Sequence, residues 1–589
     1  MRLNRFRICV IASVLLTSCA FAQNSGADVC PRVTIGGTVP EPADLRSKGG
    51  VLKVDLAYRS FVDSHGLTRY CYIDKDGNES PNLRVKPGDQ VILTLRNELP
   101  AASTQDPNRQ PMHSHGSATC ASGPMAASST NLHFHGLLIP PVCHQDDTLN
   151  TVIASSSPPF EYKFQIPIDQ PPGLYWYHPH LHGFNKAQVL GGASGALIVE
   201  GLEKDDPAAS GLPERVFIIR DQDLMNPDAA PVQSGSMPAA QVLRDAEGDI
   251  LNTGTGGGKP AKDLSINFVP VPFPEYQPAV IAMEPSQREL WRVLNASAIT
   301  YLDLQVLFND APQRVGVVAL DGIPVNDNGN HEQQVAWKFH IFLPPAARAE
   351  FIVKAPGEGI HASLVTRTVD TGPAGENDPT RPLASIVAKT DAPGPQSQLP
   401  ASSVTRNSHA AIPLSKVAPV RQRKLYFSEK PQNPNDPNSP MVFMLTVDGQ
   451  TPVPFDPNAA APDLIVTQGD VEDWIVENRT QELHDFHIHQ LHFQLLEWNG
   501  VPVDEPFLRD TVNVAYWDGK SSVYPQVKLR IDFRNPNTVG TFVYHCHLLE
   551  HADGGMMGTI RVEPMRQKAA AIEHFGSSSN STPSSSSIR

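Results

Sequence analysis

The sequence predicts an all-β protein built from β-sandwich domains, and three observations support this. Several segments alternate apolar and polar residues with the strand period of two. The 41 glycines and 55 prolines supply frequent breaks between these segments, and helical periodicity is scarce. At 589 residues the chain is too long for one ordinary core, so several such domains are expected.

Five segments show the clearest strand pattern, because their apolar residues recur at alternate positions. They are VLKVDLAY, DQVILTLRN, GALIVE, VEDWIVEN and GTIRVE, at residues 51–58, 89–97, 195–200, 471–478 and 558–563.

One sequence pattern recurs along the chain. VKPGDQVILTLRNEL at residues 85–99 is echoed by AMEPSQRELWRVLNAS at 282–297 and by VTQGDVEDWIVENRT at 466–480. This spacing predicts one fold used three times.

Linker-like stretches set the expected domain boundaries. GLEKDDPAASGLPER at 201–215 and a Pro- and Ser-rich stretch from 391 to about 420 separate three units. The Ser-rich end of the chain has the composition of a disordered tail. The predicted divisions are a first domain at 45–205, a second at 212–395, a third at 421–565 and the tail at 566–589.

The first 22 residues have the three-part plan of a secretory signal: three arginines, an apolar run of roughly ten residues and then small residues. Cleavage after Ala22 would release a soluble exported protein, periplasmic or extracellular. Cleavage before Cys19 would instead leave a lipid anchor on that cysteine, because LTSC resembles a lipoprotein box. No later apolar run of about 18 residues predicts a membrane span.

Five cysteines remain after the signal. An oxidising compartment favours pairing among four of them, and Cys30 with Cys71 and Cys120 with Cys143 are plausible pairs, although the sequence leaves the connectivity open. Cys546 is the odd one and is flanked by histidines.

The charge balance restricts the partners. With 47 Lys+Arg against 62 Asp+Glu the formal net charge is −15, which repels phosphate backbones and argues against nucleic acid.

His-x-His pairs are far more frequent than chance. The 21 histidines predict about 0.7 such pairs, and six are present. Residues two apart in a strand share a face, so each pair presents two imidazoles together, and neutral imidazole suits copper, zinc, iron and nickel. Two pairs in the first unit and two in the third could therefore converge between these units. These eight histidines are His133, His135, His178, His180, His487, His489, His545 and His547.

The segment YHCHLLEHADGGMM at 544–557 adds a second pattern. If His545 and His547 share one face, Cys546 projects from the opposite face, where His551 and Met556 follow. His484 can approach it from a neighbouring strand. Two histidines, one thiolate and a weak thioether form the blue-copper electron-transfer set.

The four motifs HFHG, WYHPH, HDFHIH and HCHLLEHADGGMM, in this order, resemble the copper motifs of the multicopper oxidases, the family of laccases and bacterial copper oxidases. The match covers nearly the whole mature chain, since LPPAARAEFIV at 343–353 resembles the family's middle domain. The resemblance implies three cupredoxin-like Greek-key β-sandwich domains that hold four copper ions.

The resemblance also implies which residues hold each copper. The type 1 ligands would be His484, Cys546, His551 and Met556. The type 2 ligands would be His133 and His487, and the type 3 pair would use His135, His178 and His547 on one ion and His180, His489 and His545 on the other.

The implied activity is laccase-like: one-electron oxidation of phenols or aromatic amines, coupled to four-electron reduction of dioxygen to water. His484, expected to be the most exposed type 1 ligand, would receive electrons from the small-molecule donor, and Cys546 would pass them on. A monomer is expected.

Two alternatives stay open. A metal oxidase acting on Cu(I) or Mn(II) in copper tolerance would use acidic residues such as Asp485 and Glu550, although the 11 methionines form no Met-rich cluster. A non-catalytic copper store or electron carrier would need only the type 1 set and would leave eight histidines unexplained. A nitrite reductase would lack the full set of paired histidines.

The sequence departs from the family pattern at two positions. Asp485 stands where Pro usually follows the type 1 histidine, and we expect its charge to favour cationic or amine-bearing donors. Ala552 stands where bacterial relatives commonly carry a proton-relaying Glu, so another carboxylate must serve. Asp147, together with Glu550 or Asp553, is predicted, with Asp146 as a further candidate.

The remaining histidines and methionine carry weaker expectations. His113 and His115 form a surface loop or an accessory metal site, and Met557 is expected to pack in the core. His182 and His492 are expected to support the ligands or to fill space.

Overall fold

The structure is a computed structural model that describes residues 30, 32–101, 120, 125–155, 157–231, 242–246, 248–254, 258–325, 335–392, 394–401, 414–436 and 439–565. The predicted signal at 1–22 with Cys19, the histidines His113 and His115 and the tail at 566–589 lie outside the described residues. No helix in the described part of the chain is long and apolar enough to cross a membrane.

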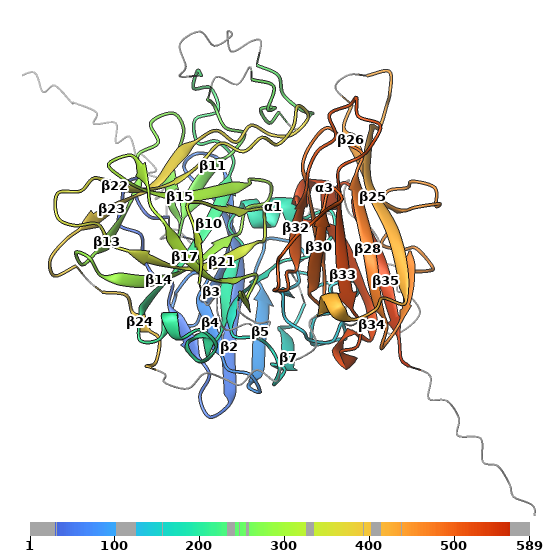
Figure 1. Cartoon of the computed structure of the whole chain (residues 1–589), viewed down its shortest axis with the longest axis horizontal. Helices are drawn as coiled ribbons and strands as arrows, with labels where there is room; N and C mark the ends of the chain where they lie inside the picture. Colours follow the sequence, from blue (N-terminus) through green and yellow to red (C-terminus); the bar gives the residue numbers. More distant parts are fainter. Residues whose placement is uncertain are drawn as a thin grey trace, which may run out of the picture.

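The predicted all-β fold is confirmed (Figure 1). Within the described residues the α-helices are short: α1 (Asn185–Leu190), α2 (Leu202–Asp205) and α3 (Leu549–Asp553). The five predicted strands all form, as β2 (Val51–Val62), β5 (Gln90–Asn97), β9 (Gly195–Val199), β28 (Val471–Asn478) and β35 (Met557–Glu563).

The first unit is a sandwich of two sheets that share one apolar core. Its outer sheet has the order β3 (Thr68–Asp74), β2, β5, β7 (Phe160–Gln165). Its inner sheet has the order β1 (Asp44–Arg46), β4 (Asn82–Val85), β9, β8 (Gly173–His178), β6 (His133–His135).

The third unit repeats this plan around a second core. One sheet has the order β26 (Met441–Val447), β25 (Arg421–Pro431), β28, β33 (Gln526–Asp532), β30 (Phe493–Trp498), β31 (Val501–Pro502). The other has the order β27 (Leu464–Thr467), β35, β34 (Gly540–Cys546), β29 (His484–Ile488), β32 (Thr511–Val514).

The second unit has its own core and is the most elaborate. One sheet has the order β12 (Val269–Val271), β11 (Asp263–Ile266), β10 (Pro213–Gln222), β14 (Arg288–Asn295), β21 (Arg348–Lys354), β17 (Val315–Leu320), β18 (Ile323–Pro324). In addition, β19 (Ala336–Lys338) pairs with β17, and β24 (Ser397–Gln398) pairs with β10. The other contains β13 (Ala279–Met283), β23 (Arg381–Ala388), β22 (Ala362–Thr366), β15 (Leu302–Phe308) and β16 (Ala311–Pro312), with β20 (Ile341–Leu343) on β15.

The recurring sequence pattern occupies the same place in each unit. β5, β14 and β28 each pair in parallel with the first long strand of their own unit, β2, β10 and β25. In β5 every second side chain is buried, because alternate side chains of a strand face the core. The domain boundaries at 45–205, 212–395 and 421–565 stay a prediction.

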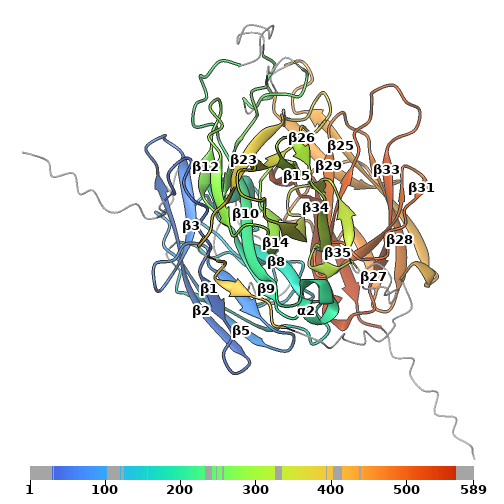
Figure 2. The same ribbon diagram turned by 60° about the vertical axis from the view of Figure 1, so that its left-hand side comes forward.

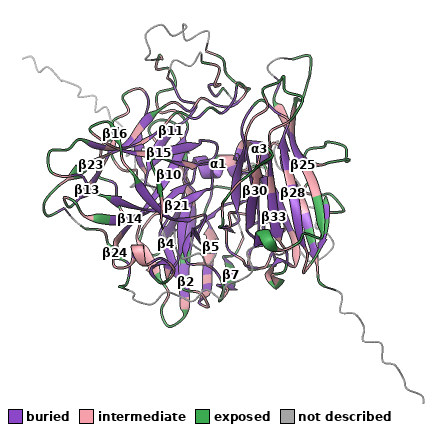
Figure 3. Ribbon diagram, viewed as in Figure 1, coloured by how far each residue is buried: buried purple, intermediate pink, exposed green. Residues whose placement is uncertain are grey.

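The three units meet at a common junction (Figure 2). There α1 of the first unit packs against α3 of the third, while β8 of the first unit contacts β14 and β21 of the second. Buried residues make up much of the sheets on both sides of this junction (Figure 3).

The two predicted disulfides are confirmed. Cys30 is bonded to Cys71 and Cys120 to Cys143, whereas Cys546 is a free, buried thiol.

Candidate metal centres

Two strand pairs carry the histidine motifs, and they are equivalent in the first and third units. In the first unit β6 and β8 are antiparallel and place His133 opposite His178. In the third unit β29 and β34 are antiparallel and place His487 opposite His545. The corresponding strands of the second unit, β15 and β22, carry no histidine. The repeated fold therefore brings histidines to matching sheet edges in two units only.

The eight predicted histidines form one buried group across the boundary of the first and third units, which we call the eight-histidine cluster. The Nε2 atom of His545 lies 3.2 Å from Nε2 of His180 and 3.3 Å from Nε2 of His489. The rings of His133 and His489 stack at 3.8 Å, and those of His135 and His487 at 3.9 Å. The predicted convergence of the two units is confirmed.

Several ring nitrogens in this cluster have no hydrogen-bond partner among the described residues. A buried polar atom left unpaired costs free energy, so a native interior normally supplies a partner. Metal ions would supply it here, since the atoms of these groups lie close enough together to hold one. The unpaired atoms are Nε2 of His133, His178 and His487, Nδ1 of His135 and His489, and both nitrogens of His547.

Neighbouring acceptors fix the protons of several imidazoles. Nδ1 of His178 lies 2.9 Å from the carbonyl oxygen of Pro179, and Nδ1 of His545 lies 2.8 Å from that of Cys546. Because a carbonyl oxygen only accepts, Nδ1 must donate, and Nε2 keeps its lone pair. Burial lowers the pKa of His178 to about 3 and that of His545 to about 4, so both rings are neutral at neutral pH.

A second buried group lies on the other side of the same strand. The Sγ atom of Cys546 is 3.6 Å from Nδ1 of His484 and 3.7 Å from Nδ1 of His551, and these two nitrogens are 3.1 Å apart. Met556 is fully buried in the same core, and its carbonyl accepts a hydrogen bond from the Cys546 N–H. Burial raises the pKa of the Cys546 thiol, and a bound cation would oppose this effect.

The expectation that His484 is exposed is wrong. Its exposed fraction is 0%, because its Nε2 is hydrogen-bonded to Oγ1 of Thr480 at 2.8 Å and the ring of Phe427 lies 4.7 Å away. A bulky donor therefore has no open edge of this imidazole to touch.

Asp485 is buried as well, and the donor preference expected of it stays a prediction. Its side chain is fully buried, and it lies on the face of β29 opposite to that of His484, because adjacent residues in a strand point to opposite faces. Burial, reinforced by the negative charges of Asp321 and Asp510, raises the pKa of this carboxyl well above its usual range. Asp485 therefore presents no surface charge that could attract cationic donors.

Among the carboxylates, Asp146 rather than Asp147 reaches the cluster. Both Asp146 oxygens lie 3.0 Å from Nδ1 of His133, and the side-chain amide of Gln490 donates to Asp146. Asp147 instead accepts hydrogen bonds from the N–H and side-chain amide of Asn150 and caps a turn. Of the two, only Asp146 contacts a histidine of the cluster, and the proton-relay role of Asp147 stays a prediction.

Glu550 and Asp553 join the first and third units. Glu550 forms an ion pair with Lys186 of α1. Asp553 accepts hydrogen bonds from the N–H groups of Gly183 and Lys186 and from the side chain of Asn185. Both carboxylates therefore link the first and third units, and their part in a proton relay stays a prediction.

Sequence reasoning missed one ion pair at the centre of the molecule. Arg348 of β21 donates to both carboxylate oxygens of Asp510, at 2.7 and 2.6 Å. Burial alone would raise the pKa of Asp510, but the attraction and hydrogen bonds of Arg348 hold that pKa below its ordinary value. The two residues are 162 positions apart, so no local spacing could reveal the pair.

The weaker expectations have mixed outcomes. Nε2 of His492 lies 3.6 Å from Oδ2 of Asp510, which suits the supporting position expected of it. The ring of His182 packs on the edge of Phe455. Met557 packs with Val543 and Ala552, as predicted for a core residue.

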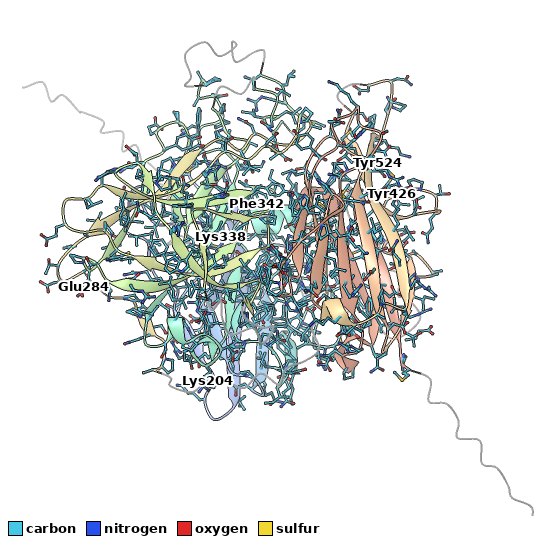
Figure 4. All side chains as sticks on the ribbon, in the orientation of Figure 1. Lys204, Glu284, Lys338, Phe342, Tyr426 and Tyr524 are labelled. Carbon is cyan, nitrogen blue, oxygen red and sulfur yellow. A yellow bond between two sulfur atoms is a disulfide. The ribbon has the colours of Figure 1, made fainter. Side chains whose placement is uncertain are left out.

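A cleft of 1190 Å³ lies between the second and third units. Lys338 and Phe342, on the side of the second unit that faces the third, line it (Figure 4). Its wall includes Asn513 on β32, which pairs with Asp485 on β29. The cleft thus reaches the strand next to the one that carries His484. Its aromatic lining is Trp337, Phe339, Phe342, Trp498 and Phe507.

Family models described as multicopper oxidase match residues 124–204 and 430–566. The chain is 26% identical to the multicopper oxidase mco of Staphylococcus haemolyticus over 492 residues, which cover 82% of this chain and 81% of that protein. It is 21% identical to a laccase of Bacillus subtilis over 505 residues, or 81% of this chain and 87% of the laccase.

Solved structures show the same fold. The McoA multicopper oxidase of Aquifex aeolicus matches with a TM-score of 0.61 and 19% identity, over 89% of this chain and 99% of that one. A multicopper oxidase of Campylobacter jejuni, described as a metallo-oxidase, matches with a TM-score of 0.58 and 22% identity, over 91% and 96%.

Proposed function

The chain belongs to the multicopper oxidase family, oxidoreductases that use oxygen as acceptor, and on that basis we propose that it is a laccase-like enzyme. It takes single electrons from phenols or aromatic amines and delivers them, four per dioxygen, so that dioxygen becomes water. Exported to the periplasm or the extracellular space, it acts as a monomer.

One observation carries this proposal: a single strand, β34, serves two groups of metal ligands. Cys546 lies with His484 and His551 on one side, and His545 lies with His180 and His489 on the other. Copper, with its one-electron chemistry, suits both ligand sets. The first set, with Met556, would hold the type 1 ion. The eight-histidine cluster would hold the type 2 ion (His133, His487) and the type 3 pair (His135, His178 and His547; His180, His489 and His545).

In this proposal Asp146 supplies protons to the eight-histidine cluster. Reducing dioxygen to water consumes four protons, and a carboxylate beside the cluster can pass them inward. Burial raises the pKa of Asp146 well above its ordinary value, so that it carries a proton more readily than a surface aspartate.

The aromatic cleft supports an organic donor. Trp337 is 56% exposed, so its ring can stack on a phenol or an aniline. Phe339 is 47% exposed, and the guanidinium of Arg314 lies over its ring, 5.0 Å from the centroid. We expect Trp337→Ala to raise KM for a phenol and to leave the oxidation of Cu(I) unchanged. Oxygen uptake is the measurement. If Trp337→Ala changed KM equally for the phenol and for Cu(I), the cleft would not be the binding site of the organic donor.

A second candidate function is a metal oxidase, and a different observation favours it. Oε1 of Glu482 lies 3.4 Å from Nε2 of His551, and burial, reinforced by the negative charge of Glu429, raises the pKa of Glu482 well above its usual range. A cation bound at these carboxylates would lie next to a type 1 ligand. Glu482→Gln should then lower the rate on Cu(I) or Mn(II) and spare phenols.

Copper content and the visible spectrum test the proposal directly. Four copper ions per chain and a strong Cys-to-copper charge-transfer band are expected. Cys546→Ser should abolish the band and oxygen uptake and leave the other three ions bound, because the thiol faces away from the eight-histidine cluster. One ion per chain in the wild type would instead support the third alternative, a non-catalytic electron carrier.

Two disulfides support an oxidising compartment, because cytosolic thiols are kept reduced. We propose cleavage after Ala22, with a lipid anchor at Cys19 as the alternative. Fractionation of cells expressing the full chain, with mass measurement of the mature amino end, distinguishes the two.

A further inference from the structure

The second unit contributes no residue to the predicted ligand set, yet one of its side chains reaches the centre of the molecule. Arg348 is fully buried, and its guanidinium has five N–H donors in a fixed fork. One donates to the Leu174 carbonyl of the first unit, two donate to the Ala346 and Asp321 carbonyls of the second, and two donate to the Asp510 carboxylate of the third. Residues of all three units thus accept hydrogen bonds from the Arg348 guanidinium.

Asp510 in turn contacts two candidate metal ligands, His135 and His487. Its Oδ1 atom lies 3.2 Å from Nε2 of His135 in the first unit. Its backbone carbonyl lies 2.7 Å from Nδ1 of His487 in the third. Thr511 donates its hydroxyl to the same Oδ1 atom and helps to hold the carboxylate.

These contacts select opposite nitrogens of the two rings. His135 donates through Nε2, so its Nδ1 keeps the lone pair and is free to bind metal. His487 donates through Nδ1, so its Nε2 is the free nitrogen. The two unpaired atoms of these rings are the same ones, Nδ1 of His135 and Nε2 of His487.

Gly136 provides independent support, since it directly follows His135. A Cβ atom at this position would lie 2.7 Å from Nη2 of Arg348 and 2.7 Å from Oδ2 of Asp510. Its φ of +85° also disfavours other residues. The lack of a side chain at Gly136 therefore leaves room for the Arg348–Asp510 ion pair beside His135.

We propose that Arg348 is a positioning residue for the eight-histidine cluster: by clamping Asp510, it fixes which nitrogen of His135 and of His487 is available to metal. The proposal rests on the ligand assignment made above. It gives the second unit a direct part in building a site to which it supplies no ligand.

Arg348→Lys tests this, because lysine keeps the charge but has only three donors and no fork. We expect the affinity for the coppers of the eight-histidine cluster to fall about 10- to 100-fold, the usual effect of losing a residue that orients a ligand. The Cys-to-copper band should persist, because Cys546 lies on the other side of β34. Arg292→Lys is the matched control: Arg292 is equally buried in the second unit, and its ion pairs are with Glu214 and Glu350.

The readout that separates positioning from folding is the imidazole nitrogen NMR spectrum of the copper-free protein. The wild type and Arg292→Lys should show the His135 proton on Nε2, and Arg348→Lys should show a mixture of both tautomers. An unchanged His135 tautomer, or copper binding equal to that of Arg292→Lys, would overturn the proposal.

If Arg348→Lys does not fold, Arg348→Gln, which also lacks the fork that clamps Asp510, is judged by the same tautomer and copper measurements, with the same expected and contrary results. Wild-type copper content is measured in parallel. One ion per chain there would reject the proposed function, whereas the His135 tautomer in the copper-free protein still decides the role of Arg348.

Discussion

At the scale of single residues, Asp146 and Asp147 are chain neighbours with different roles. Asp146 is buried against His133, and Asp147 caps a turn at Asn150. Sequence alone could not choose between two adjacent carboxylates, because the difference lies in which face of the loop turns inward.

We predict that Asp146→Asn lowers turnover with dioxygen by roughly 100-fold or more, the usual contribution of a positioned proton donor. Asparagine keeps an acceptor oxygen for Nδ1 of His133 but cannot carry a proton, so the copper content should not change. Oxygen uptake and copper content are the measurements. Asp147→Asn is the control and should leave turnover unaltered; the reverse ranking of the two variants would restore Asp147 as the relay.

At the scale of elements, the α1–α3 contact joins the first and third units at the cluster they share. Asp553 of α3 accepts two backbone hydrogen bonds and one from a side chain around the start of α1. Removing this acceptor leaves the partly buried N–H of Lys186 and side-chain amide of Asn185 without this partner. Each such group costs about 1–3 kcal/mol.

We therefore predict that Asp553→Ala destabilises the copper-free protein by at least about 1 kcal/mol. Thermal unfolding without copper is the appropriate measurement, because metal binding would add its own stabilisation. Asp76→Ala, at an exposed turn, should change stability by less than about 0.5 kcal/mol. Equal shifts in the two variants would mean that the helix contact contributes little.

At the scale of the whole molecule, buried ion pairs join the first and second units. Glu214 of β10 accepts hydrogen bonds from Arg84 of the first unit and from Arg292 of its own unit, at 2.6 and 2.7 Å. Burial alone would raise the pKa of Glu214, but the two arginines lower it from 4.5 to about 2. This shift corresponds to roughly 3 kcal/mol of stability.

The sign of this shift gives a pH prediction. Because the pKa is lower in the folded protein, the stabilisation is present above pH 4.5 and is lost as the pH falls toward about 2. Glu214→Gln should therefore unfold at a lower temperature than the wild type at neutral pH, with a difference that shrinks across this acid range. Glu563→Gln, in an exposed pair with Arg561, should show almost no difference at any pH. A pH-independent difference for Glu214→Gln would reject the ion-pair explanation.

By itself, the sequence determined the all-β class, the three-fold repeat and the two-sided strand that carries Cys546, whereas it left the disulfide partners open. These follow from local rules: side chains alternate along a strand, and ligand types follow from residue chemistry. Only the tertiary structure decided that His484 and Asp485 are buried, that Asp146 reaches His133 and that Arg348 clamps Asp510. Burial and ion pairing depend on segments brought together from different units. For example, the N–H of Leu483 in the third unit, next to His484, donates to the carbonyl oxygen of Thr371 in the second, a contact that no spacing along the chain encodes.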